Sequence, residues 1–166
     1  MWNKDNKTRN YKMKFKILIV VGNYYKEFSK SLLFCAKEKL KNELKVKHKS
    51  KIMKFEVDDI EVPGSFEVPI IIARNIKKYD GFIALGCIIK GETQHFEFIS
   101  QSITNAIMQL SIDHKKPIGN GIITCLNKEQ ANDRSSAKRQ EAAEPLYLYY
   151  QNKMSLEYSP KNNPES

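Results

Sequence analysis

The sequence has no apolar run that approaches the roughly 20 residues a membrane-spanning helix needs. Its amino-terminal region contains lysines but no apolar segment of the signal-peptide type. No internal repeat is visible. A chain of 166 residues can bury roughly two thirds of its unfolded surface. We therefore expect a soluble, cytoplasmic protein with one packed domain and no membrane partner.

Cysteine is scarce, and its positions do not suggest a metal site. Cys35, Cys87 and Cys125 are odd in number, stand in apolar surroundings and lack metal-ligand spacing. Buried, reduced thiols therefore fit the sequence better than disulfides. The sequence predicts no zinc or other metal site.

The net charge of +9 is unevenly distributed. Residues 1–16 hold six Lys/Arg and one Asp, and residues 37–54 hold eight Lys and two Glu, so the rest of the chain carries −2. The basic segments lack the interleaved aromatic side chains of a single-strand binder. We expect a solvated lysine-rich surface and no nucleic-acid partner, with a nucleic-acid patch as the less favoured alternative.

Four segments have the pattern of buried or half-buried strands, and a helical pattern follows each of them. The strands are predicted at residues 15–21, 51–57, 82–89 and 118–125. The helices are predicted around Leu32 to Leu40, at 70–78, from Phe96 to about residue 113, and from Asn127 onward. This alternation predicts a parallel sheet with right-handed crossovers and helices on both faces.

The domain is expected to span residues 15–150. A flexible basic arm at 1–14 and a disordered tail at 151–166 are expected to flank it. Because a proline inside a helix removes a hydrogen bond, Pro145 predicts a break over residues 141–145. The residues expected to dock beyond the break are Leu146, Leu148 and Tyr149.

Polar and glycine residues concentrate directly after the predicted strands. They occupy residues 23–26, 62–67, 90–95 and 126–138. The carboxyl ends of parallel strands lie at one edge of a sheet, where α/β proteins bind ligands. The four segments therefore predict one site.

The turn at residues 90–95 enters a predicted helix whose free N–H groups and dipole favour an anion. A phosphate near Glu92 and Thr93 fits this position, and an ordinary helix cap formed by Thr93 is the alternative. Arg134 and Lys138 add two cations that share a face if their segment is a continuous helix. On their own, they are better explained as solvated charges.

His95 lies in the first turn of the helix, where an imidazole can exchange protons with a bound ligand, and a structural histidine is the alternative. His48 and His114 lie in lysine-rich connections and are expected to be bystanders. Tyr24 follows a strand, where its ring can stack on a planar ligand or pack in the core. Glu67 is by default a surface carboxylate favoured by a helix dipole.

Taken together, four stretches resemble the 6,7-dimethyl-8-ribityllumazine synthase family. They are PGSFEVP at 63–69, ALGCIIKGETQHFEFIS at 84–100, PIGNGIIT at 117–124 and EQANDR at 129–134. The resemblance covers about residues 15–150 and implies a flavodoxin-like, three-layer α/β sandwich in which helices flank a four-stranded parallel sheet. It also implies a transferase of riboflavin biosynthesis that uses no metal or redox cofactor.

The resemblance implies two small-molecule substrates, 5-amino-6-(D-ribitylamino)uracil and 3,4-dihydroxy-2-butanone 4-phosphate, which condense with release of phosphate and water. It assigns proton transfer to His95 and ring stacking to Tyr24. The implied phosphate contacts are the Glu92 backbone, Thr93, Arg134 and Lys138. The other implied site residues are Ser65, Phe66, Glu67, Ile88, Ile89 and Asn120.

Members of the family form pentamers, some of which build sixty-subunit shells. We therefore expect a homopentamer in which the region of Asn120, Arg134 and Lys138 completes a neighbour's site. A non-catalytic flavin- or lumazine-binding protein, or a shell-forming relative, is the alternative. The departures from the family pattern are Asn23 for an arginine, Arg139 for a glycine, a shortened loop between Arg134 and Lys138, and Pro145 within a helix.

Overall fold

The architecture is a central sheet of long parallel strands with one short antiparallel strand at its edge. The computed structural model describes residues 12–43, 47–48, 51–137, 143, 145–146 and 149–150. The strands are β1 (Lys12–Gly22), β2 (Lys47–His48), β3 (Lys51–Val62), β4 (Gly81–Ile89) and β5 (Ile118–Cys125). Their order is β2-β3-β1-β4-β5, and only β2 is antiparallel to its neighbour. The predicted four-stranded parallel sheet is confirmed, with β2 as an addition.

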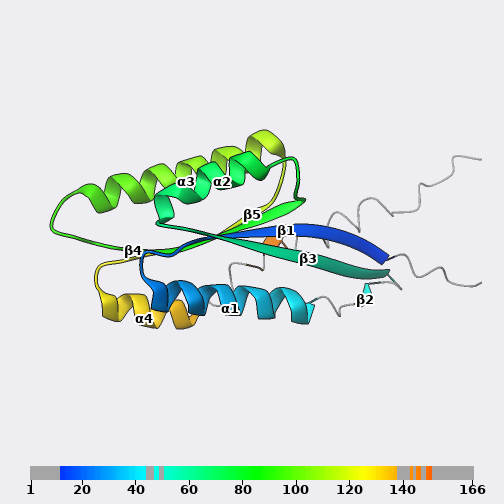
Figure 1. Cartoon of the computed structure of the whole chain (residues 1–166), viewed down its shortest axis with the longest axis horizontal. Helices are drawn as coiled ribbons and strands as arrows, with labels where there is room; N and C mark the ends of the chain where they lie inside the picture. Colours follow the sequence, from blue (N-terminus) through cyan, green and yellow to red (C-terminus); the bar gives the residue numbers. More distant parts are fainter. Residues whose placement is uncertain are drawn as a thin grey trace, which may run out of the picture.

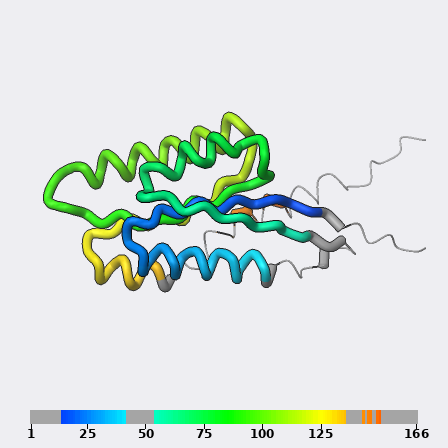
Figure 2. The backbone as a smooth tube through the Cα atoms, viewed as in Figure 1, coloured from blue at the N-terminus to red at the C-terminus, as the bar shows by residue number. Residues whose placement is uncertain are grey.

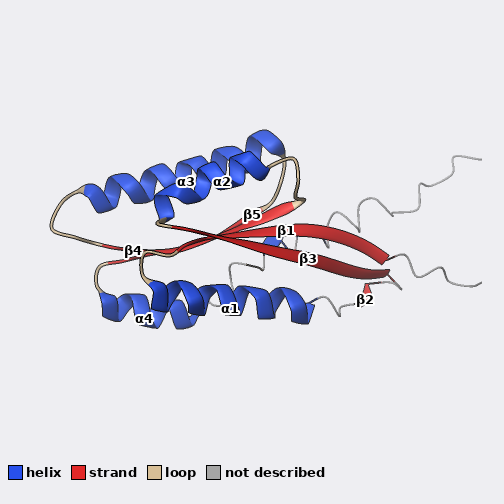
Figure 3. Cartoon of the chain, viewed as in Figure 1, coloured by secondary structure: helices blue, strands red, loops and turns tan. Residues whose placement is uncertain are grey.

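Helices cover both faces of the sheet and complete three layers (Figure 1). On one face lie α1 (Lys26–Glu43) and α4 (Lys128–Ala137). On the other lie α2 (Val68–Asn75), which follows the short 3₁₀ helix η1 (Ser65–Glu67), and α3 (His95–His114) (Figure 3). This flavodoxin-like sandwich is the fold that the sequence predicted. No helix in the described part of the chain is long and apolar enough to cross a membrane.

The core has two halves, one on each face of the sheet, because successive side chains of a strand point to opposite faces. On β1, Ile19 packs in the half beneath α1 and α4, whereas Leu18 packs in the half beneath α2 and α3. Both side chains are fully buried. The central strands are therefore apolar on both faces, as the uncharged run in β4 predicted.

Two strands are longer than predicted. β1 begins three residues before the expected residue 15, and Lys14 forms an ion pair with Glu56 of β3. β3 continues five residues beyond the expected residue 57, although Asp58 and Asp59 resemble a loop sequence. These carboxylates are tolerated because β3 lies near the sheet edge, where their side chains are exposed and find polar partners. Tyr79 donates its hydroxyl to Asp58 Oδ2 at 2.9 Å, and Lys37 pairs with Asp59.

The carboxy-terminal segment docks partly as expected. Leu146 is fully buried, and Tyr150 stacks on Phe15 with ring centroids 4.0 Å apart. The expected docking of Tyr149 is wrong, since this side chain is 39% exposed and Tyr150 fills the core position instead. Leu148, residues 1–11, residues 151–166 and most of the expected break at 141–145 lie outside the described residues.

The topology brings distant parts of the chain to one end of the sheet. The connections that follow β1, β4 and β5 lie at the same end (Figure 2). The end of β3 joins them, because the Asn23 N–H that follows β1 donates to the Val62 carbonyl at 2.8 Å. This is the carboxyl edge at which the sequence predicted a site.

Candidate active site

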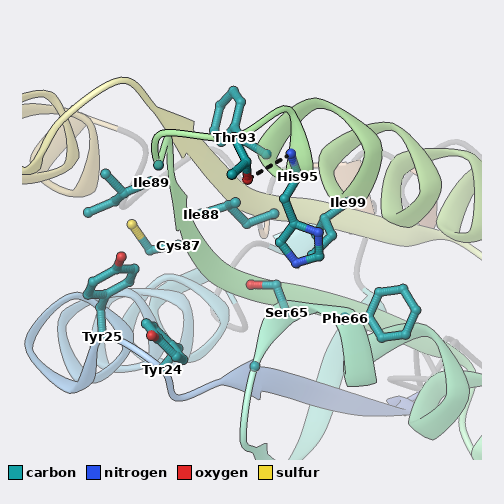
Figure 4. Close-up of a pocket in the computed structure, with 13 residues that line it drawn as sticks. Tyr24, Tyr25, Ser65, Phe66, Cys87, Ile88, Ile89, Thr93, His95 and Ile99 are labelled. Carbon is teal, nitrogen blue, oxygen red and sulfur yellow. Dashed lines mark hydrogen bonds between the residues drawn. The ribbon is translucent and has the colours of Figure 1, made fainter.

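A cavity of about 330 Å³ opens at the carboxyl edge, between the residues that follow β1, β3 and β4 (Figure 4). Seven predicted site residues line it: Tyr24, Ser65, Phe66, Ile88, Ile89, Thr93 and His95. Six further lining residues were not predicted: Tyr25, Gly64, Cys87, Gly91, Phe96 and Ile99. Most of the wall is apolar, so its few hydroxyl and imidazole groups can orient a ligand.

The β1 side of the cavity presents an exposed aromatic ring. Tyr24 is 73% exposed, and its ring meets that of Tyr25 edge to face, with centroids 4.9 Å apart. The turn that carries both residues is fixed by Ser29, whose hydroxyl donates to the carbonyls of Gly22 at 2.7 Å and Tyr25 at 3.0 Å. The Tyr24 ring is thus available to stack on a planar ligand.

The segment that follows β3 reaches the cavity because two glycines on the neighbouring strands β1 and β4 leave room for it. A Cβ on Gly22 would lie 2.6 Å from the Ser65 backbone nitrogen, and a Cβ on Gly86 would collide with Ser65 Oγ. Ser65 is consequently only 7% exposed, and its hydroxyl points into the cavity (Figure 4). The two glycines thus position a polar group at the centre of the site.

The β4 side carries the polar turn predicted from the sequence. The backbone N–H of His95 donates to Thr93 Oγ1 at 3.4 Å, and the imidazole points toward Ser65 and Phe66 (Figure 4). Gly91 lines the cavity, and a Cβ there would meet no protein atom within 4 Å. Since no described glycine has a positive φ, neither packing nor backbone conformation accounts for Gly91. Close approach of a ligand to the backbone accounts for it better.

The inner wall holds groups that stay protonated at neutral pH. Burial raises the pKa of the Cys87 thiol to about 12, with a further contribution from the neighbouring Cys125. Burial, together with Tyr24 and Cys87, also raises the pKa of Tyr25. A thiol with such a pKa is a poor nucleophile. The cavity therefore suits proton transfer and anion binding better than covalent catalysis by cysteine.

The structure does not bring every predicted site residue into the cavity. Glu67 is half-buried in η1 and Glu92 is exposed in the turn, but neither lines the cavity. Asn120 lies on the edge strand β5, where its Oδ1 accepts from the Ile122 N–H at 3.1 Å. Arg134 donates from Nη1 to the Thr124 carbonyl at 2.7 Å. Lys138 lies outside the described residues.

Among the described residues, no group of three or more His, Cys, Asp and Glu side chains has the arrangement of a metal site. The polar groups in the cavity are instead the hydroxyls of Ser65, Thr93 and the two tyrosines, and the imidazole of His95. Beside them lies the amino-terminal end of α3, where the first N–H groups have no partner within the helix and favour an anion.

The fold and the cavity define a three-layer α/β protein with a ligand site at the carboxyl edge of a parallel sheet. Residues 14–148 match the family model described as 6,7-dimethyl-8-ribityllumazine synthase. The chain belongs to the 6,7-dimethyl-8-ribityllumazine synthase family, as its sequence motifs predicted.

Relatives that carry the name 6,7-dimethyl-8-ribityllumazine synthase support this assignment. The one from Bartonella tribocorum is 38% identical over 122 residues, which are 72% of this chain and 74% of the relative. The one from Polaromonas sp. is 36% identical over 132 residues, 78% of this chain and 81% of the relative. A shorter match, to the protein from Corynebacterium urealyticum, is 42% identical over 79 residues, 48% of this chain and 49% of the relative.

Proposed function

We propose that this chain is a transferase of riboflavin biosynthesis that forms 6,7-dimethyl-8-ribityllumazine. Its substrates are 5-amino-6-(D-ribitylamino)uracil and 3,4-dihydroxy-2-butanone 4-phosphate, and it releases phosphate and water. The observation that carries the proposal is the convergence of the family motifs. Residues from the PGSFEVP and GCIIKGETQHF stretches, together with the tyrosines after β1, line a single cavity.

The reaction needs proton transfer and anion binding more than a strong nucleophile. An amine attacks a ketone, phosphate leaves, and a second amine closes the ring, and every step moves a proton. His95 is proposed to exchange these protons, because its imidazole lines the cavity and points toward its centre. Thr93 and the start of α3 are proposed to hold the phosphate, and Tyr24 to stack on the pyrimidine ring. Holding both substrates together lowers the barrier further.

We also propose that each site is completed by a second copy of the chain in a homopentamer in the cytoplasm. Asn120 and Arg134 do not line the cavity of their own chain, although both match family positions assigned to the site. The outward side of α3 supports such an interface. Phe98, Met108 and Ile112 are 64%, 59% and 62% exposed, and their spacing brings them to one side of the helix.

The test is to mix the purified protein with both substrates and follow the absorbance and fluorescence of the lumazine product. Formation of the product at a rate above that of the uncatalysed condensation is the expected result. Binding of lumazine without turnover by the folded protein would instead identify a non-catalytic lumazine-binding relative. Absence of both would overturn the proposal.

A further inference from the structure

An ion pair bridges the two ends of the turn that carries Thr93 and His95. Lys90 is the first residue after β4, and Glu97 is the third residue of α3. Lys90 Nζ lies 2.9 Å from Glu97 Oε1, and this hydrogen bond lowers the pKa of the Glu97 carboxyl. Neither residue lines the cavity. The pair therefore acts on the site only through the residues it encloses.

Few other bonds hold this turn in the described part of the chain. At its start, the Lys90 N–H donates to the Cys125 carbonyl at 2.9 Å. At its end, the long 3.4 Å bond from the His95 N–H to Thr93 Oγ1 is present, and the Gln94 side chain does not cap α3. Residues 90–95 are all exposed, so packing adds little. The ion pair is the one side-chain link between the two ends of the turn among these contacts.

We propose that the Lys90–Glu97 ion pair is a positioning element of the candidate active site, which fixes the turn so that Thr93 and His95 face the cavity. The inference rests on the proposed function for its kinetic consequence only. The pair is exposed, with side-chain exposures of 45% and 50%, so its expected effect is small. The small effect concerns Thr93 and His95, which are proposed to bind the phosphate and to transfer protons. The reaction rate is most sensitive to small displacements of such groups.

Lys90 and Glu97 each have a rival role in which the residue acts without its partner. Lys90 can be a direct phosphate ligand, since it is a cation next to the turn. Glu97 can act on the helix dipole alone, because it lies in the first turn of α3. The positioning role requires only that positions 90 and 97 carry opposite charges. Unlike the two rival roles, it does not depend on which of the two positions carries the positive charge.

Charge reversal separates positioning from these rival roles. The variants are Lys90→Gln, Glu97→Gln, and the double variant Lys90→Glu with Glu97→Lys. The matched control is Glu56→Gln, which breaks the exposed Lys14–Glu56 pair between β1 and β3. Two quantities are measured in each: the hydrogen-exchange rates of the amides in residues 91–95, and kcat and KM for each substrate.

Positioning predicts that each single variant exchanges these amides about two- to fivefold faster, the range expected when an exposed ion pair is lost. KM for the phosphorylated substrate is expected to rise by a similar factor, with the thermal midpoint unchanged. The double variant should restore both quantities, and Glu56→Gln should leave both unaltered.

Unchanged exchange in both single variants would overturn the inference, whether or not the protein makes lumazine. A double variant as impaired as Lys90→Gln would also overturn it and identify Lys90 as a phosphate ligand. If Glu97→Gln changes the exchange rates and Lys90→Gln does not, the inference is also overturned, because Glu97 then acts only through the dipole of α3. Failure of the proposed function is a separate result, because the wild-type protein would then form no lumazine while the exchange rates still decide the role of the pair.

Discussion

His95 is the residue on which the proposed chemistry depends most. Its imidazole lines the cavity, close to the start of α3 where an anion is favoured. Replacing it removes the proton carrier but leaves the hydroxyl of Thr93 and the backbone N–H groups in place. The two roles proposed for this turn, proton transfer and anion binding, can therefore be separated by experiment.

His95→Ala is expected to lower kcat by roughly 10²–10⁴-fold, the usual contribution of a general acid–base group. Binding of inorganic phosphate should persist, because the groups proposed to hold it are unchanged. The control is His114→Ala at the opposite end of α3, which should behave like the wild-type protein. An unimpaired His95→Ala variant would remove this residue from the mechanism.

Cys87 gives the protein a pH dependence with a defined sign. Its thiol has an ordinary pKa of 9.0 when unfolded and a pKa of about 12 in the folded protein. Between these values the unfolded chain loses the proton while the folded chain retains it. The stabilising contribution of the Cys87 thiol to the free energy of unfolding is fully present below about pH 9 and is lost as the pH rises toward about 12.

We expect the free energy of unfolding to fall above pH 9 by at most about 1.4 kcal/mol per pH unit from this group. Urea unfolding at pH 7.5, 9 and 10 measures the slope. Cys87→Ala should flatten it, whereas Cys35→Ala, at a half-buried position on α1, serves as the control. Equal slopes in all three proteins would contradict the assigned pKa. Tyr79 and Tyr150 contribute with the same sign and cancel in this comparison. Part of the contribution of Tyr25, however, is lost together with Cys87, which helps to raise the Tyr25 pKa.

Single residues differed in how far the sequence revealed them. His95 was singled out by its place in the polar turn after an apolar strand, whereas Ser65 was identified as a site residue only through the resemblance to the family. Cys87 and Ile99 also line the cavity, but their chemistry and spacing are those of core residues. Only the three-dimensional arrangement distinguishes a side chain that faces a cavity from one that faces the core.

At the scale of the element, strand prediction was most accurate where burial alone determines the strand. The bounds of β5 agree with the prediction at both ends, since Pro117 stops the connection before it and the polar residues from Asn127 onward begin the next helical region. β3 was predicted too short, because its last five residues are held by pairing with β1 and by partners of Asp58 and Asp59. Such partners come from distant parts of the chain and leave no local signal.

Two glycines that look alike in the sequence should respond differently to a methyl group. Gly22→Ala is expected to lower the free energy of unfolding by about 1–3 kcal/mol, the usual cost of overpacking, because its Cβ would lie 2.6 Å from the Ser65 backbone. Gly91→Ala should leave stability unchanged and weaken phosphate binding, since its Cβ would fill open space beside the cavity. Urea unfolding and phosphate titration of both variants measure these effects.

If Gly91→Ala binds phosphate as tightly as the wild-type protein, the ligand does not approach the backbone at this position. If Gly22→Ala is fully stable, the β1 and η1 segments must be able to separate without cost. The first outcome concerns the turn that faces the ligand, and the second concerns the packing beneath it.

At the scale of the whole molecule, the positions of His95 and Arg134 suggest a division of the site between chains. Mixing His95→Ala with Arg134→Gln protein, unfolding and reassembling them together, should restore activity that neither variant has alone. Random assembly of equal amounts would make about one quarter of the sites intact if each site takes these residues from two neighbouring chains. No restored activity in assembled mixtures would place both residues in the same chain's site.

A second prediction about assembly follows from the exposed apolar side of α3. Ile112→Lys should reduce the particle size measured by light scattering, because a charge would be buried at the proposed interface. Phe34→Lys is the matched control, since Phe34 is an isolated exposed aromatic on α1, on the other face of the sheet. An unchanged size for Ile112→Lys would exclude this side of α3 from the interface.

Because Ser65 lies between Gly22 and Gly86, the cavity can form only when the strands of the sheet have folded. Because β1, η1 and β4 must all be in place before the pocket exists, a partly folded chain has nothing with which to bind substrate. Any ligand of the pocket therefore stabilises the entire fold, by about 2.7 kcal/mol at one hundred times its dissociation constant. In a cell, the supply of substrate would then influence how much of the protein survives degradation as well as how fast it works.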